Sequence, residues 1–253
     1  MGMSERQPHP RRRVGAYGID APYVPVIFGV GGLVLLGIAV LNAAQGINPW
    51  AIITCALSGV WFLACAACYL HTTRAGKFVV WAEIIQGLQL RGAERVLDLG
   101  CGRGAVLLAI AQRLPHGQAI GIDLWKTTDQ SGNSMAMTRC NAVREGVATR
   151  VTLETAGMRA LPFADGAFDV VVSSLAIHNI PGAAERARAV EEAARVLKPG
   201  GRLVITDIRA AEQYRDELRQ VGMGAVTMRP LGWRFWYGGP WMAAQLVTAT
   251  KPP

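Results

Sequence analysis

A long run of consecutive residues without any charged side chain constrains this chain of 253 residues more than any other feature. The run covers residues 21–73, between Asp20 and Arg74. Charged residues make up 17% of the whole chain, whereas an ordinary soluble domain has roughly 25%. Because the residues outside the run have the composition of a soluble domain, the missing charge has been removed from one segment and is not diluted over the protein.

The charge-free run divides into two apolar halves at a polar, helix-breaking turn. Residues 24–44 and 50–70 are apolar, and the turn between them has the sequence Gln-Gly-Ile-Asn-Pro. About 20 apolar residues in a helix are needed to cross a bilayer, and each half supplies that length. The run therefore predicts an antiparallel transmembrane hairpin over residues 21–73. A buried hairpin of a soluble domain is the alternative, but soluble helices normally keep a polar face.

Basic residues flank the predicted hairpin on both sides. Arg11–Arg13 precede it, Arg74 and Lys77 follow it, and the connecting turn carries no charge. The positive-inside rule then places a basic tail (residues 1–20), both termini and the remaining domain (residues 74–253) in the cytoplasm, as a multi-pass protein of the cell membrane. The net charge of +6 carried by residues 74–253 suits the anionic surface of a lipid bilayer. Nucleic acid is not an expected partner, because beyond Arg11–Arg13 the basic residues are scattered singly.

Cysteine usage indicates neither a disulfide framework nor a metal site. Cys55, Cys65 and Cys68 lie within the second predicted span, and Cys101 and Cys140 lie in the cytoplasmic part, where thiols stay reduced. A single Cys-x-x-Cys pair without a second pair indicates packing, so no metal is expected.

From about residue 80 onward, strand-like and helix-like segments alternate, which is typical of a doubly wound α/β sheet. The apolar run Val170–Val172 within residues 168–174 indicates a strand buried on both faces. The expected strands are 95–99, 119–123, 150–155, 168–174, 202–206, 226–229 and 244–250, and the expected helices are 105–114, 134–145, 183–197 and 211–221.

A glycine-rich turn follows the first of these strands and indicates a nucleotide site. Gly100, Gly102 and Gly104 allow a tight turn and a close approach of a ligand to the backbone, and Asp123 ends the second strand, where a carboxylate can bind ribose hydroxyls. A dehydrogenase would share this pattern. However, Asp98 directly before the glycines would repel a pyrophosphate and would suit a cationic ligand.

The motif Val96-Leu97-Asp98-Leu99-Gly100-Cys101-Gly102-Arg103-Gly104 resembles motif I of the class I S-adenosylmethionine-dependent methyltransferases. Residues 161–169 and 195–201 resemble two later landmarks of that family in the same order, so the resemblance covers roughly residues 80–210. It is strongest to the type 11 methyltransferases, which act on small molecules, quinones and lipids. The implied fold is a seven-stranded Rossmann-like methyltransferase sheet, here preceded by a two-helix transmembrane hairpin.

The resemblance implies an S-adenosyl-L-methionine site formed by the glycine turn and the strand ends. Asp98 would lie near the ammonium group of the cofactor, Asp123 would bind the ribose, and Leu124 would pack on the adenine. The family often has an acidic residue for the adenine amino group where this chain has Gly157, and the following Met158 is a possible substitute. The implied cofactor-binding residues are Asp98, Gly100, Cys101, Gly102, Gly104, Asp123, Leu124, Met158 and Ser173, with Ser174 beside the last of them.

Two further segments carry candidate chemistry. His178 follows the fourth strand near the expected methyl group and titrates near neutrality, so it is the candidate catalytic base; the alternative is that it only orders its loop. The polar run 126–133 either lines the pocket or forms a turn.

Five aromatic residues occur among residues 233–241 together with glycines and a proline. Such a loop either packs in the core, enters a membrane interface or covers an apolar acceptor.

These features together predict a membrane-anchored methyltransferase with a lipophilic acceptor, such as a quinone, an isoprenoid or a lipid, because an anchor confines the site to where such molecules dissolve. Two alternatives stay open. The same enzyme class could act on a soluble small molecule or a protein, or the chain could be a non-catalytic cofactor-binding membrane protein.

Overall fold

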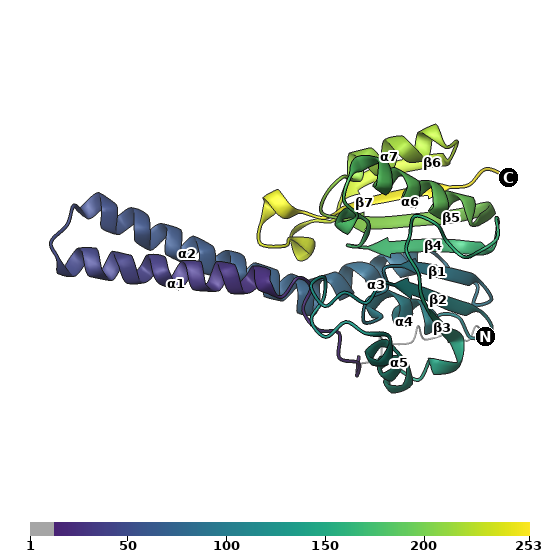
Figure 1. Cartoon of the computed structure of the whole chain (residues 1–253), viewed down its shortest axis with the longest axis horizontal. Coiled ribbons are helices and arrows are strands. Elements are labelled where there is room, and N and C mark those ends of the chain that lie inside the picture. Colours follow the sequence, from purple (N-terminus) through teal and green to yellow (C-terminus); the bar gives the residue numbers. More distant parts are fainter. Residues whose placement is uncertain (1–12) are drawn as a thin grey trace, which may run out of the picture.

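Two long apolar helices project from an α/β domain in the computed structural model, which describes residues 13–253 (Figure 1). The expectations for Arg11 and Arg12, and for most of the basic tail, lie outside the described residues. Helix α1 (Tyr23–Ala44) and helix α2 (Pro49–His71) form an antiparallel hairpin. Both are long and apolar enough to cross a membrane by length and composition. The expected turn is present, and Asn48 caps α2 by accepting a hydrogen bond from the Trp50 backbone nitrogen at 2.9 Å.

The two helices of the hairpin approach each other closely where both carry glycine. A Cβ atom added to Gly32 would lie 2.9 Å from the Gly59 carbonyl oxygen, and one added to Gly59 would lie 2.9 Å from that of Gly32. Small residues let helix backbones come together in this way. The glycines therefore set the contact between α1 and α2.

The second helix of the hairpin continues into the domain without a break. A π-helical turn (Thr72–Gly76) joins α2 to helix α3 (Lys77–Gly87). The sequence did not predict α3. It predicted that the domain begins at residue 74, but no helix ends there. Charges return at Arg74 and Lys77, but no strong helix breaker such as proline accompanies them. As a result, the first element of the domain is a direct extension of the hairpin.

A seven-stranded sheet forms the centre of the domain, as the resemblance implied. Its strand order is β3-β2-β1-β4-β5-β7-β6, and only β7 is antiparallel to its neighbours. Strands β1–β7 are Arg95–Leu99, Gln118–Asp123, Val151–Thr155, Phe168–Ser174, Leu197–Asp207, Gly224–Pro230 and Gln245–Thr250. The remaining α-helices are α4 (Ala105–Ala111), α5 (Met135–Arg144), α6 (Ala183–Arg195) and α7 (Ala211–Gln220).

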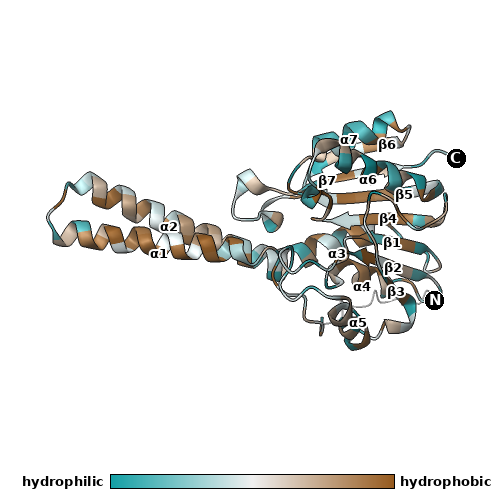
Figure 2. Cartoon of the chain, viewed as in Figure 1, coloured by the Kyte–Doolittle hydropathy of each residue, from teal (hydrophilic) through white to brown (hydrophobic). Residues whose placement is uncertain are grey.

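Helices cover both faces of this sheet. One apolar core joins α3 and α4 to the face that carries Val96 and Val170, and the other joins α6 and α7 to the face that carries Leu97 and Val171. This alternation follows from the two-residue period of a strand. Figure 2 shows the apolar strands beside the more polar helices α6 and α7, and the apolar hairpin next to the domain.

Most expected elements have the predicted positions, with two differences at their ends. The helix expected over 105–114 ends at Ala111, and three further residues of turn precede Pro115. The segment 197–201, expected to form a turn after a helix ending at Leu197, belongs to β5 instead. Leu197 pairs with Phe168, and the register shifts before Val170 pairs with Arg202. A strand irregularity therefore accommodates the Pro-Gly-Gly sequence.

Candidate active site

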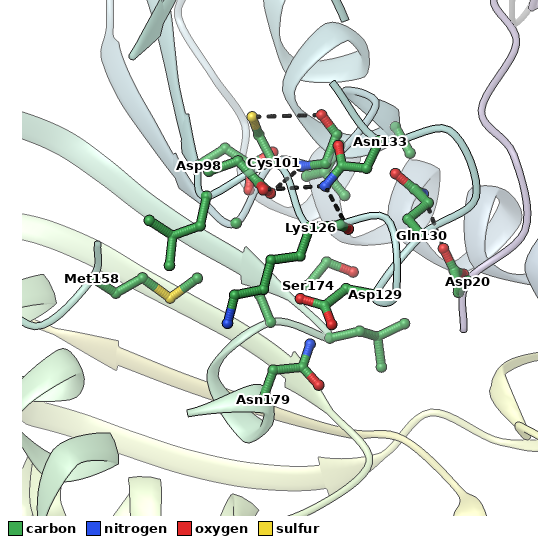
Figure 3. Close-up of a pocket in the computed structure, with 18 of the residues that line it drawn as sticks. Asp20, Asp98, Cys101, Lys126, Asp129, Gln130, Asn133, Met158, Ser174 and Asn179 are labelled. Carbon is green, nitrogen blue, oxygen red and sulfur yellow. Dashed lines mark hydrogen bonds between the residues drawn. The ribbon is translucent and has the colours of Figure 1, made fainter. Parts of the chain in front are cut away.

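A cavity of about 590 Å³ opens at the carboxyl ends of β1, β2 and β4 (Figure 3). In an open α/β sheet this is where the strand order reverses and ligands bind. Seven of the ten predicted site residues line it: Asp98, Gly100, Cys101, Gly102, Asp123, Leu124 and Met158. The polar run 126–133 contributes Lys126, Asp129, Gln130 and Asn133 to the lining and also forms turns at 127–129 and 131–132, so the structure matches both interpretations of that run.

The glycine turn has a backbone that only glycine adopts easily. Gly100, Gly102 and Gly104 have φ angles of 73°, 50° and 85°. The backbone nitrogens of Gly100 and Cys101 donate to the Ile122 carbonyl oxygen at 2.9 and 3.0 Å, which holds the turn against the end of β2. The turn is thus fixed with its bare backbone toward the cavity.

Replacing Gly100 with alanine is expected to destabilise the domain and to obstruct the cavity. The new Cβ atom would collide with Ala176 and would lie 2.7 Å from the Met158 Cε atom, in a backbone conformation that L-residues adopt at a cost of about 1 kcal/mol or more. We expect at least a tenfold loss of cofactor affinity by calorimetry. Gly87, at the end of α3, has open space around its Cβ position and does not line the cavity, so it provides the control: Gly87→Ala should bind within threefold of the wild type. Equal affinities of the two variants would contradict the close packing at Gly100.

Asp98 is a buried carboxylate that lines the cavity. Its exposed fraction is 1%, and neither carboxylate oxygen has a hydrogen-bond partner among residues 13–253. Burial, followed by the negative charge of Asp123, raises the pKa of Asp98 to about 8. Burying an unpaired carboxylate is costly, so this position is suited to a ligand that brings a positive charge.

Asp123 organises the loops around the cavity. Its Oδ2 atom accepts from the Gly102 backbone nitrogen at 2.8 Å, and its Oδ1 atom accepts from the Trp125 backbone nitrogen at 2.6 Å and from Asn133 Nδ2 at 3.1 Å. The carboxylate therefore ties the glycine turn to the end of β2, a role that the sequence did not indicate. Its predicted ribose contact remains a prediction, and the side chain does line the cavity.

Three predicted site residues do not line the cavity. Gly104 precedes α4 and packs near Leu108. Ser173 is buried, and its hydroxyl donates to the Leu99 carbonyl oxygen at 3.0 Å. Its neighbour Ser174 does line the cavity, because successive side chains of a strand point in opposite directions. The expectation that both serines line the crevice therefore holds for Ser174 alone.

His178 is the third predicted residue outside the cavity lining. It lies in a short 3-10 helix (Ile177–Asn179), and its Nδ1 atom is 2.5 Å from Asp207 Oδ1. Its backbone nitrogen and the Tyr214 hydroxyl both donate to Asp207 Oδ2, at 3.1 and 3.2 Å. The imidazole is thus oriented by a buried carboxylate, while the adjacent Asn179 side chain lines the cavity.

A buried polar cluster at the cavity wall was missed by the sequence analysis. We call it the Asp20 cluster: Asp20, Thr73, Lys77, Gln130 and Tyr237. Lys77 Nζ lies 2.7 and 2.8 Å from the two Asp20 carboxylate oxygens. Thr73, Tyr237 and Gln130 also donate to that carboxylate, at 2.9, 2.9 and 3.0 Å.

Asp20 stays charged because of these partners. Burial by itself would raise the pKa of its carboxyl group, but the positive charge of Lys77 and the donated hydrogen bonds outweigh burial and lower the pKa below its usual value. One feature of the sequence could have indicated this ion pair: Asp20 and Lys77 are opposite charges close to the two ends of the charge-free run.

Helix α3 forms an apolar wall of the cavity. Phe78 and Trp81 line it from α3, and the Trp81 indole nitrogen donates to Ser174 Oγ at 2.9 Å. Ile180 and Pro181 contribute further apolar surface. Because α3 continues α2, the cavity lies at the base of the apolar hairpin.

Comparison with known proteins agrees with this architecture. Residues 97–205 match the family described as "Methyltransferase domain" (Methyltransf_11). The chain is 33% identical over 149 residues to 27-O-demethylrifamycin SV methyltransferase of Amycolatopsis mediterranei, covering 56% of this chain and 50% of that protein. It is 39% identical over 134 residues to a ubiquinone/menaquinone biosynthesis C-methyltransferase of Geobacter sulfurreducens, covering 53% and 45%. The chain thus spans about half the length of these curated relatives.

Solved structures share the fold. Geranyl diphosphate C-methyltransferase from Streptomyces coelicolor A3(2), in complex with Mg²⁺, geranyl diphosphate and S-adenosyl-L-homocysteine, superposes with a TM-score of 0.56 at 14% identity, covering 72% of this chain and 80% of that one. The family match and this fold confirm the resemblance of the glycine motif. Residues 97–205 therefore match a methyltransferase domain, and the chain has the fold of a solved methyltransferase.

Proposed function

We propose that this protein is a membrane-anchored methyltransferase that transfers a methyl group from S-adenosylmethionine to a lipophilic small molecule. The observation that carries the proposal is the unpartnered Asp98 carboxylate beside the glycine turn, in a cavity whose wall continues the apolar hairpin. A cationic cofactor and an apolar acceptor are the two ligands that such a cavity suits.

The residues present fit the cofactor. Asp98 offers a carboxylate to the ammonium group, and the bare backbone of the glycine turn accommodates the methionine part. Asp123 lies where it can accept from ribose hydroxyls, and Leu124 and Met158 offer apolar surface to the adenine. When bound, the cofactor supplies a methyl group on a positively charged sulfur, so the protein acts mainly by positioning donor and acceptor.

The hairpin supports a membrane anchor. Its outward side chains are apolar, and Val26, Val30, Leu33, Leu41 and Leu57 are each more than half exposed. Burying such a surface in lipid removes it from water. The basic residues at the base and the uncharged tip favour an orientation with the domain in the cytoplasm.

The acceptor is proposed to be lipophilic, with quinones, isoprenoids and lipids as its classes. Phe78, Trp81 and Ile180 give the cavity apolar surface for such an acceptor. Two of the relatives are named for rifamycin and for ubiquinone or menaquinone biosynthesis, which supports an acceptor of this chemical kind.

His178 is the proposed base for an acceptor that must lose a proton. Asp207 holds Nδ1, which leaves Nε2 to accept a proton, and the flanking residues Ala176 and Asn179 line the cavity. His178→Ala should lower kcat by about 10²–10⁴-fold, the usual contribution of a positioned base, with cofactor affinity within threefold of the wild type. Timed methyl-transfer assays measure kcat, and calorimetry measures the affinity for the cofactor. Unchanged kcat would leave His178 with the structural role of ordering its loop.

The test of the proposed function is a transfer assay with S-adenosylmethionine carrying a labelled methyl group. Purified full-length protein in vesicles is given extracted membrane lipids in one arm and aqueous metabolites or soluble protein in the other. Label in the organic extract supports the proposal, and label only in the aqueous arm indicates the soluble-acceptor alternative. Cofactor binding without any transfer would indicate a non-catalytic binding protein.

A further inference from the structure

The loop between β6 and β7 runs along the hairpin. We call residues 233–243 the aromatic loop; in Figure 1 it extends in yellow from the sheet toward α2. Trp233 stacks on His71 with ring centroids 5.5 Å apart, and Trp241 packs on Trp61 at 5.3 Å. Thr72 donates to the Trp236 carbonyl oxygen at 2.6 Å. The aromatic loop therefore follows α2 from its domain end toward its middle.

The positions of these contacts along α2 indicate how deeply the aromatic loop would lie in a bilayer. His71 and Trp61 are ten residues apart, which corresponds to about 15 Å of helix. The hydrocarbon core of a bilayer is about 30 Å thick. If α2 crosses the bilayer with His71 at the cytoplasmic boundary, Trp61 and its partner Trp241 lie near the middle of the core.

The composition of the aromatic loop suits such a position. No charged residue occurs between Arg234 and Lys251, and Arg234 pairs with Glu83 at 2.8 Å beside the domain. Trp233 and Trp241 are 61% and 52% exposed, so most of their indole surface is left uncovered by the rest of the chain. Indole rings prefer the boundary region of a membrane over water, which suits Trp233 beside His71. Deeper along α2, the uncharged Trp241 adds apolar ring surface.

Part of the backbone of the aromatic loop is hydrogen-bonded within the protein. Irregular backbone is tolerated at membrane depth only where its polar groups are satisfied within the protein. The backbone nitrogens of Tyr237, Met242 and Ala244 donate to carbonyl oxygens of the same loop at 3.0–3.1 Å. Gly76 lets the Arg234 carbonyl approach the helix, because an added Cβ atom would collide with it.

We propose that the aromatic loop is a third membrane-embedded element, which enters the cytoplasmic leaflet beside α2 and presents Trp233 and Trp241 to lipid. The inference rests on the proposed membrane anchor. It also places the active site at the membrane surface, since the Tyr237 hydroxyl of the same loop donates to Asp20, a residue of the cavity wall.

Photo-crosslinking to lipid tests the proposal in full-length protein. The photoreactive residue p-benzoylphenylalanine replaces Trp241, Trp233, Leu57 or Val221, one at a time, in vesicles of phosphatidylcholine and phosphatidylglycerol with an alkyne-tagged phospholipid acyl chain. Leu57 reports on the hairpin, and Val221 is a partly exposed site at the end of α7. Cofactor binding by each variant checks that it is folded.

We expect lipid adducts from positions 241, 233 and 57, and at least tenfold fewer from 221. Adducts from 57 but not from 241 and 233 would overturn the proposal for the aromatic loop and leave the anchor intact. An absence of adducts from 57 would overturn both. Protein–protein adducts from 241 in place of lipid adducts would show that a second copy covers the loop, which also counts against the proposal.

Discussion

Asp98→Asn is expected to weaken the binding of S-adenosylmethionine by about 100-fold. The change keeps the size of the side chain but removes the charge that would pair with the cofactor's ammonium group. A hydrogen bond to a charged group contributes about 1.5–3 kcal/mol, and the carboxylate has no other partner among the described residues. A loss near the upper value corresponds to about two orders of magnitude in Kd. Calorimetry of the full-length protein in detergent measures it.

A carboxylate elsewhere in the cavity provides the matched control. Asp129 also lines the cavity but is exposed, so Asp129→Asn should change Kd by less than threefold. Similar losses in the two variants would mean that general negative charge attracts the cofactor, and that Asp98 has no particular contact with it.

The pKa of Asp98 adds a pH readout to the same experiment. With a pKa of about 8 in the cofactor-free protein, the carboxyl group is largely protonated at neutral pH and must lose its proton to pair with a cation. Affinity in the wild type should therefore rise as the pH increases through about 8, and this component should be missing in Asp98→Asn. Because the folded state binds this proton more tightly than the unfolded state, the same group makes the cofactor-free protein less stable as the pH rises from about 4 to 8.

Asp20→Ala is expected to destabilise the protein by about 3–5 kcal/mol, the usual cost of leaving a buried charge without its partner. Lys77 Nζ would lose both of its contacts with the Asp20 carboxylate, and Thr73, Gln130 and Tyr237 would lose an acceptor. A loss of this size lowers Tm by roughly 10 °C in a domain of this length. Thermal unfolding in detergent, followed by circular dichroism, measures the change.

Two comparisons separate the ion pair from a general effect of mutation. The double variant Asp20→Asn/Lys77→Met removes both charges and should recover at least half of the lost Tm, because no unpaired charge stays buried. Glu185→Gln breaks the exposed pair with Arg159 and should leave Tm nearly unchanged, because exposed ion pairs contribute little to stability. If Asp20→Ala were as stable as Glu185→Gln, the Asp20 cluster would have no special role.

The parts of the fold that depend on local sequence pattern could be predicted. The hairpin follows from missing charge, β4 from its continuous apolar run, and the glycine turn from residues that adopt positive φ angles. The domain fold followed from the resemblance in the motif around Asp98, which the family match confirms. Each of these features is contained within one continuous stretch of the sequence.

The parts that depend on how distant segments meet could not be predicted. Asp20 and Lys77 are 57 positions apart. They come together because the antiparallel hairpin brings the end of α2 next to the start of α1. The orientation of Ser173 required the pleat of β4 to be known, and the contact of His178 with Asp207 required the neighbouring end of β5. Helix α3 lacked its own start signal, because it is an extension of α2 through the π-helical turn.

That turn also sets the rotational phase between the two parts of the protein. Each residue of an α-helix turns the chain by about 100°, and a π-helical turn accommodates an additional residue. The segment Thr72–Gly76 therefore determines the direction in which the cavity faces when the domain is rotated about the hairpin axis. If the hairpin crosses a bilayer along that axis, this direction lies in the membrane plane and decides on which side of the hairpin an acceptor reaches the cavity. Inserting or deleting one residue in this segment would turn it by about 100°.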